Sequence, residues 1–179
     1  MPSKQRWDRV LILMAALPLG CAGGNPGLPP APVDLGRMDR LAFYSAWQVL
    51  NRADVREAAV TAICLGMGED GSEVPPAAFL RGFSDFIPPV RARSACLHSE
   101  GGTIEDSQVL TLEGDPALIL SVLEVVPVPG SASVRIQLES SGRAPREFEC
   151  RIRETAQRVP IGRGPPQASS GSRVSVLGC

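Results

Sequence analysis

Apolar residues recur with a helical period in the first half of the chain and with a strand period in the second half. A helix is predicted over 35–51, where small and apolar residues form one stripe: Met38, Leu41, Ala42, Ser45 and Val49. A second helix is predicted over 75–87, because the Pro-Pro pair at 75–76 suits a helix start and apolar residues follow it at helical spacing. A second Pro-Pro pair, at 88–89, ends this helix.

Strand patterns dominate from residue 109 onward. Four strands separated by turns rich in Gly, Pro and Ser are predicted, at 109–113, 117–126, 131–139 and 146–154. A weaker strand pattern precedes them at 58–67, and a short edge strand is predicted at 173–179. The segment 117–126 is apolar on both faces apart from Ser121 and Glu124, so we expect it in the centre of the sheet.

Helices followed by antiparallel strands indicate an α+β fold. We therefore expect two N-terminal helices packed on an antiparallel sheet of four to five strands. In the order of its elements the chain resembles cystatin-like and NTF2-like domains, a resemblance of fold that implies no function. The expected organisation is a single α+β domain over 35–161, followed by a flexible C-terminal segment, 162–179, that ends in the short strand.

The first 20 residues have the pattern of a signal peptide. Lys4, Arg6 and Arg9 give the start a positive charge, and an apolar run of ten residues follows from Val10 to Leu19. A bilayer span needs about 20 apolar residues, so this run is too short to be a transmembrane helix. A short helix buried in the fold would leave the charge asymmetry unexplained, and we expect 1–20 to be a signal peptide.

The signal-like segment ends in Leu19-Gly20-Cys21, which resembles the end of the lipobox of bacterial lipoproteins. The resemblance covers about 21 residues and implies that Cys21 becomes the lipid-modified first residue of the mature chain. It places the protein in the bacterial cell envelope, and Ala22 after the cysteine resembles lipoproteins of the outer membrane. The alternative is a cut after Ala22, which would give a periplasmic or secreted protein. The Gly- and Pro-rich segment 21–34 is expected to be a tether.

The other cysteines are expected to form two disulfides. Once Cys21 is set apart, four remain, an even number in an exported chain: Cys64, Cys96, Cys150 and Cys179. Three pairings are possible, and sequence spacing alone cannot choose among them. We favour Cys64 with Cys96 and Cys150 with Cys179, because this pairing closes the shorter loops.

Charge and motifs argue against several partners. Without the signal segment the chain carries 15 basic and 18 acidic residues, a net charge of −3, with no basic block, so nucleic acid is not expected to be a partner. The mature chain has neither a lysine-containing P-loop nor a dinucleotide-binding glycine motif. We therefore expect no bound cofactor.

Residues for catalysis or metal binding are few. His98 is the sole histidine, and Ser84 in Gly-Phe-Ser-Asp-Phe lacks the final glycine of a nucleophile elbow. Cys96 and His98 have no second ligand pair near them for zinc. Two acidic loops lack the spacing of a calcium loop, one with Glu69, Asp70 and Glu73 and one with Glu100, Glu105 and Asp106. We expect neither catalytic nor metal-binding residues.

Two functions remain open. The favoured one is a lipid-anchored envelope protein that acts as a non-catalytic binding or structural domain, with the membrane as one partner and an envelope protein or polymer as another. The alternative is a periplasmic or secreted hydrolase with a pocket between sheet and helices, in which His98 or a loop carboxylate is the base.

Overall fold

The computed structural model describes residues 28–29, 31–99, 101–156 and 172–179. The expected signal peptide, Cys21, most of the tether and the segment 162–171 lie outside these residues. Their expected roles therefore stay predictions.

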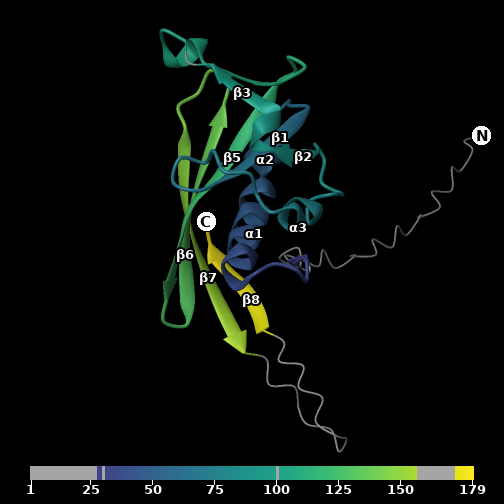
Figure 1. Cartoon of the computed structure of the whole chain (residues 1–179). Helices are drawn as coiled ribbons and strands as arrows, with labels where there is room; N and C mark the ends of the chain where they lie inside the picture. The colour runs from purple at the N-terminus through teal and green to yellow at the C-terminus, as the bar shows by residue number, and fades with distance from the viewer. Residues whose placement is uncertain (1–27, 30, 100, 157–171) are drawn as a thin grey trace, which may run out of the picture.

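A six-stranded sheet forms the body of the molecule, with strand order β2-β1-β5-β6-β7-β8 (Figure 1). The strands of the structure are β1 (Ala62–Met67), β2 (Val90–Ala92), β3 (Cys96–Ser99), β4 (Gln108–Thr111), β5 (Ala117–Val128), β6 (Ser131–Ser140), β7 (Arg146–Ala156) and β8 (Ser172–Gly178). The pairs β2–β1 and β1–β5 are parallel, and the pairs from β5 to β8 are antiparallel. Strands β3 and β4 form a separate antiparallel pair.

Helix α1 (Arg37–Leu50) covers one face of the sheet and is followed by two short helices, α2 (Ala53–Arg56) and α3 (Ala77–Arg81). Four residues of its apolar stripe, Leu41, Ala42, Ser45 and Val49, are buried, whereas Met38 at its start is exposed. Aromatic rings from α1 and the α3 region extend this core: Phe43, Trp47, Phe79, Phe83 and Phe86. Trp47 is half-buried and stacks on Phe83 with 5.8 Å between ring centroids, so its role is packing.

The expected architecture of two helices on an antiparallel sheet of four to five strands is wrong. The sheet has six strands and is partly parallel, and only one long helix lies on it. The second expected helix shrinks to α3, and the residues after it form turns that bring Phe83 and Phe86 onto α1. Strand β2 has three residues, too few to show a period, and the parallel pairing of β1 with β5 joins segments far apart in sequence.

Strand β5 lies inside the sheet, between β1 and β6, as its apolar pattern predicted. Its residues 117–123 are all buried. Side chains such as Leu118 and Leu120 face α1, whereas Ala117 and Ile119 face the opposite side. Both faces of this part of the strand are therefore covered.

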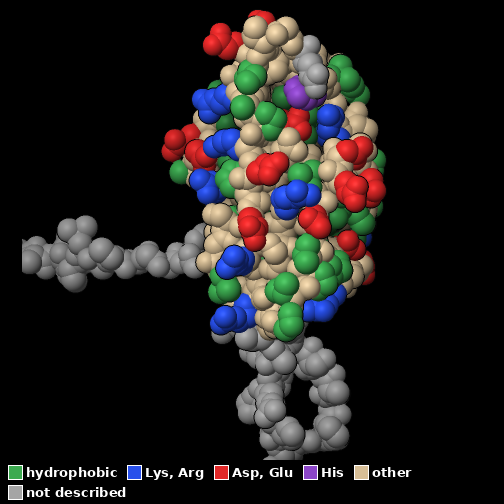
Figure 2. Space-filling view, turned by 90° about the vertical axis from the view of Figure 1, so that its left-hand side faces the viewer, with side chains coloured by type: hydrophobic (Ala, Val, Ile, Leu, Met, Phe, Trp, Pro, Cys, Tyr) green, Lys and Arg blue, Asp and Glu red, His purple; other side chains and the backbone are tan. Residues whose placement is uncertain are grey.

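The β3–β4 pair covers the other face of β1 and β5. A disulfide joins Cys64 on β1 to Cys96 at the start of β3, and a small second core surrounds it with Val109, Ala117 and Ile119. Beyond this cover, the same face of β6 and β7 carries charged side chains of both signs (Figure 2). The ion pair between Arg135 and Glu124, with 3.5 Å between nitrogen and oxygen, lies on this open face.

Strand β8 forms the edge of the sheet and is covalently tied to it. A second disulfide joins Cys179, the residue after β8, to Cys150 on β7. Two disulfides indicate an oxidising, extracytoplasmic compartment, and their pairs are those with the shorter loops. None of the helices among the described residues has the length and apolar character to cross a membrane.

Candidate functional site

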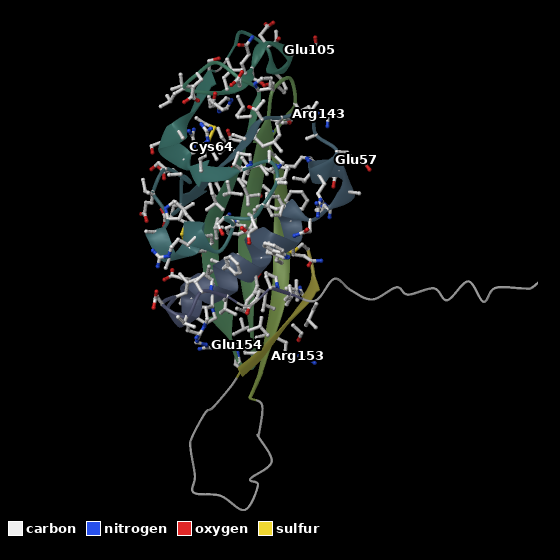
Figure 3. The ribbon with its side chains drawn as sticks, turned by 90° about the vertical axis from the view of Figure 1, so that its right-hand side faces the viewer. Glu57, Cys64, Glu105, Arg143, Arg153 and Glu154 are labelled. Atoms are coloured by element: carbon white, nitrogen blue, oxygen red, sulfur yellow. A yellow bond between two sulfur atoms is a disulfide. The ribbon has the colours of Figure 1, made fainter. Side chains whose placement is uncertain are left out.

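A pocket of about 440 Å³ lies at one end of the sheet, where the β3–β4 layer meets the end of β6. Its lining comes from the end of β3, the segment 101–107, the end of β6 and the turn before β7. His98, Glu139 and Arg143 are its ionisable lining residues. Arg143 lies toward the same end of the molecule as Glu105 in Figure 3, opposite Arg153 and Glu154. The volume suits a small ligand.

Strand alternation directs His98 and Glu139 toward each other. His98 follows Cys96 by two residues on β3, so both side chains leave the same face of the strand, the one toward the sheet. On β6, Ile136 and Leu138 belong to the core beside α1, so Glu139 projects from the opposite face. The lone histidine is visible near the upper end of that face in Figure 2.

Glu139 approaches the imidazole closely. Its Oε2 lies 2.9 Å from Nδ1 of His98, and the two side chains are 16% and 24% exposed. The distance is that of an ion pair, and Oε2 is a buried oxygen without a hydrogen-bond donor among the described residues. A carboxylate next to Nδ1 favours a proton on that nitrogen, which leaves Nε2 as a hydrogen-bond acceptor when the imidazole is neutral.

Two of the three hydroxyl groups of the pocket lining have other partners. Thr103 Oγ1 lies 2.8 Å from Asp106 Oδ2, and Ser107 Oγ donates to Ile104 O at 2.7 Å. Ser140 follows Glu139 on β6, so its side chain leaves the other face of the strand. The pocket thus brings together an imidazole and a carboxylate with no hydroxyl bonded to the imidazole among the described residues.

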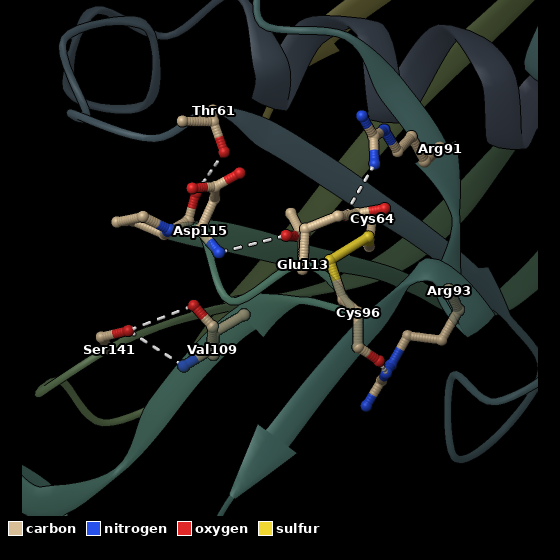
Figure 4. The surroundings of a disulfide bond; sticks show 11 residues. Thr61, Cys64, Arg91, Arg93, Cys96, Val109, Glu113, Asp115 and Ser141 are labelled. Carbon is tan, nitrogen blue, oxygen red and sulfur yellow. Dashed lines mark hydrogen bonds and ion pairs between the residues drawn. A yellow bond between two sulfur atoms is a disulfide. The ribbon is translucent and has the colours of Figure 1, made fainter.

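The Cys64–Cys96 disulfide and its surroundings hold the pocket wall in place (Figure 4). Arg93 donates from Nη1 to Cys96 O at 2.8 Å, which fixes the chain entering β3. The Ser141 hydroxyl, in the turn after β6, accepts from the N–H of Val109 on β4 at 2.9 Å and also lies 3.3 Å from Val109 O. The turn before β7 is therefore tied to the β3–β4 layer.

One shifted carboxyl lies near the disulfide but outside the pocket lining. A hydrogen bond from the Thr111 side chain, with help from Arg91, lowers the pKa of Glu113 below its ordinary value. Arg91 Nη1 lies 3.2 Å from Glu113 Oε2. The carboxyl is exposed, so this contact stabilises a surface turn.

The residues weighed from the sequence lie in different places. Ser84 is exposed after α3, and Glu69, Asp70 and Glu73 are exposed in the loop after β1. A hydrogen bond from the backbone N–H of Ser72 lowers the pKa of Asp70. The Asp70 carboxylate therefore stabilises the turn in this loop. The described part of the chain contains no group of three or more His, Cys, Asp and Glu side chains placed to hold a metal ion.

Glu139 is the pocket residue that sequence reasoning missed. It lies 41 residues after His98 and occupies an ordinary polar position in a half-solvated strand. The one available signal was that the sole histidine needs a partner from elsewhere in the chain. Nothing local identified which carboxylate that would be.

Comparisons with protein-family models, with curated proteins and with solved structures gave no match to this chain. The pocket's chemistry is therefore the basis for the functional argument.

Proposed function

We propose that the protein is a lipid-anchored domain of the bacterial cell envelope that binds a ligand in the His98–Glu139 pocket without altering it chemically. The observation that carries this proposal is the pocket itself, which joins a largely buried carboxylate and an imidazole without a hydroxyl nucleophile bonded to them among the described residues.

The anchor rests on the sequence together with the disulfides. The charged start, the ten-residue apolar run and the lipobox-like end support export and acylation at Cys21. The two disulfides support the same compartment independently, because they form in oxidising surroundings. Ala22 after the cysteine favours the outer membrane as the destination.

One observation favours the hydrolase alternative. A carboxylate beside Nδ1 of a histidine is the arrangement that orients an imidazole as a general base. A nucleophilic hydrolase also needs a hydroxyl or thiol within hydrogen-bond reach of Nε2. The hydroxyls of Thr103 and Ser107 are bonded elsewhere, which weakens this alternative.

A screen of a fragment library against the domain, residues 28–179, separates the two functions. The chemical shift of the His98 Cε1–H signal reports on the pocket, because His98 is the sole histidine. We expect saturable shifts and no product from ester, amide or glycoside substrates. Turnover that His98→Gln abolishes would establish the hydrolase instead, and a library without any saturable shift would contradict pocket binding.

A further inference from the structure

The pocket differs in charge between its interior and its rim. Glu139, with its side chain 16% exposed, supplies a carboxylate in the interior, whereas Arg143 is exposed in the turn before β7. Arg143 forms no ion pair with any other residue that the structure describes. The site thus presents a negative group inside and a positive group at its opening.

The larger apolar side chains of the lining lie near the opening. Ile104, which is 58% exposed, and Pro145 supply its larger apolar side chains. Gly101 and Gly102 leave their part of the wall without side chains. A ligand that fills about 440 Å³ here would contact the apolar side chains of Ile104 and Pro145 and at least two groups of opposite charge.

We propose that the pocket binds a small zwitterion, an amino acid or short peptide, with its ammonium group toward Glu139 and His98 and its carboxylate toward Arg143. This inference rests on the proposed binding function. An ammonium group donates three hydrogen bonds, and the carboxylate of Glu139 and Nε2 of a neutral His98 are acceptors for them. An arginine guanidinium binds a carboxylate through two parallel hydrogen bonds.

Burial decides which charge of the ligand matters more. An ion pair with a largely buried carboxylate is screened less than one with an exposed arginine. We therefore expect removal of the ligand's ammonium to weaken binding more than removal of its carboxylate. The carboxylate of Glu139 would repel an anionic ligand that lacks an ammonium group.

The test uses dialanine and its two blocked forms, N-acetyl-dialanine and dialanine amide, titrated at pH 7.5 with the His98 Cε1–H shift as the readout. Dialanine is expected to produce a saturable shift. The acetylated form should bind at least tenfold more weakly and the amide about threefold more weakly. Glu139→Gln should remove the preference for the free ammonium, and Arg143→Gln should make dialanine and its amide bind alike.

Glu147→Gln on the open face of β7 is the matched control and should bind dialanine as the wild type does. Two results would overturn the zwitterion proposal. One is equal binding of the acetylated and free forms, and the other is no saturation by dialanine up to about 10 mM, a concentration that would detect even weak binding. If other fragments still shift His98 saturably, the binding function survives that failure. If no fragment does, both proposals fall.

Discussion

At the scale of residues, the pocket depends on two side chains that the fold brings together from separate strands. His98 lies on a four-residue strand held by the Cys64–Cys96 disulfide, and Glu139 lies near the end of a ten-residue strand. Their 2.9 Å approach therefore depends on how the β3–β4 layer packs on the sheet. Close packing at glycine positions of the sheet face under the β3–β4 layer helps to set how this layer packs.

Gly66 on β1 is one such residue. A Cβ at this position would lie 1.8 Å from the carbonyl oxygen of Gly71, so backbone would have to move. We expect Gly66→Ala to lower the free energy of unfolding by about 3 kcal/mol, the upper part of the range for overpacking. Urea unfolding measures this. Gly102→Ala is the control, because nothing lies within 4 Å of its Cβ, and an equal loss in both variants would contradict the account.

The lowered pKa of Asp54, on the other side of the sheet, predicts that the free energy of unfolding depends on pH. The side-chain hydrogen bond from Arg146, 2.5 Å in length, is the largest cause of a lowered pKa of Asp54, with Arg52 adding to it. A folded-state pKa below the unfolded value gives stability that is present above the unfolded pKa, near 3.9, and is lost as the pH falls through the folded pKa.

Asp54→Asn should therefore reduce the free energy of unfolding at pH 7 by about 0.5 kcal/mol, a small value because the ion pair is solvent-exposed. The difference from the wild type should disappear at the acid end of the titration, where Asp54 is protonated. Unfolding midpoints from pH 2 to 7 measure it. Asp85→Asn, at an exposed position without an ion pair among the described residues, should show no such trend, and a constant difference for Asp54→Asn would contradict the mechanism.

At the scale of elements, periodicity predicted the long helix and the long strands, together with β4, but missed the short strands β2 and β3. Helix α1 and strands β5 to β7 match their expected ranges within a few residues, because each buries one face or two along ten or more positions. Strands β2 and β3 have only three and four residues, and no alternation was recognised in them. Glu139 was missed for a different reason, because it lies 41 residues after His98 and occupies an ordinary polar position on β6.

The two disulfides should affect different elements. Each closes a loop of about 30 residues, with sequence separations of 32 and 29, so removal of either should cost about 3 kcal/mol in the unfolding free energy. The double variant Cys64→Ala/Cys96→Ala should speed amide exchange in β3 and β4 and broaden the His98 signal. Cys150→Ala/Cys179→Ala should speed exchange in β8 and leave His98 unchanged.

Hydrogen exchange followed by mass spectrometry measures this separation. Each variant serves as the control for the other, since the loops they close are nearly equal in length. Loss of protection in β3 and β4 in both variants would show that the β3–β4 layer depends on the whole sheet rather than on its own disulfide.

At the scale of the whole molecule, the pocket and the start of α1 lie at opposite ends of the sheet. Arg37 at the start of α1 forms an ion pair with Glu154 on β7, with 2.6 Å between nitrogen and oxygen. The preceding residue on β7, Arg153, lies opposite Ser131 at the start of β6. Glu139 lies eight residues further along β6, about 26 Å at 3.3 Å per residue. Figure 3 shows the two ends, marked by Glu154 and Arg143. The pocket therefore lies at the end of the sheet away from the start of α1.

The intact mass of the mature protein from its native host, with and without reduction and alkylation, tests the central claim most directly. The account predicts a chain that begins at Cys21, carries the added mass of acyl groups, and exposes four further thiols only after reduction. An unacylated chain that begins at Gly23, or one whose four thiols alkylate without reduction, would contradict an anchored and disulfide-bonded envelope domain.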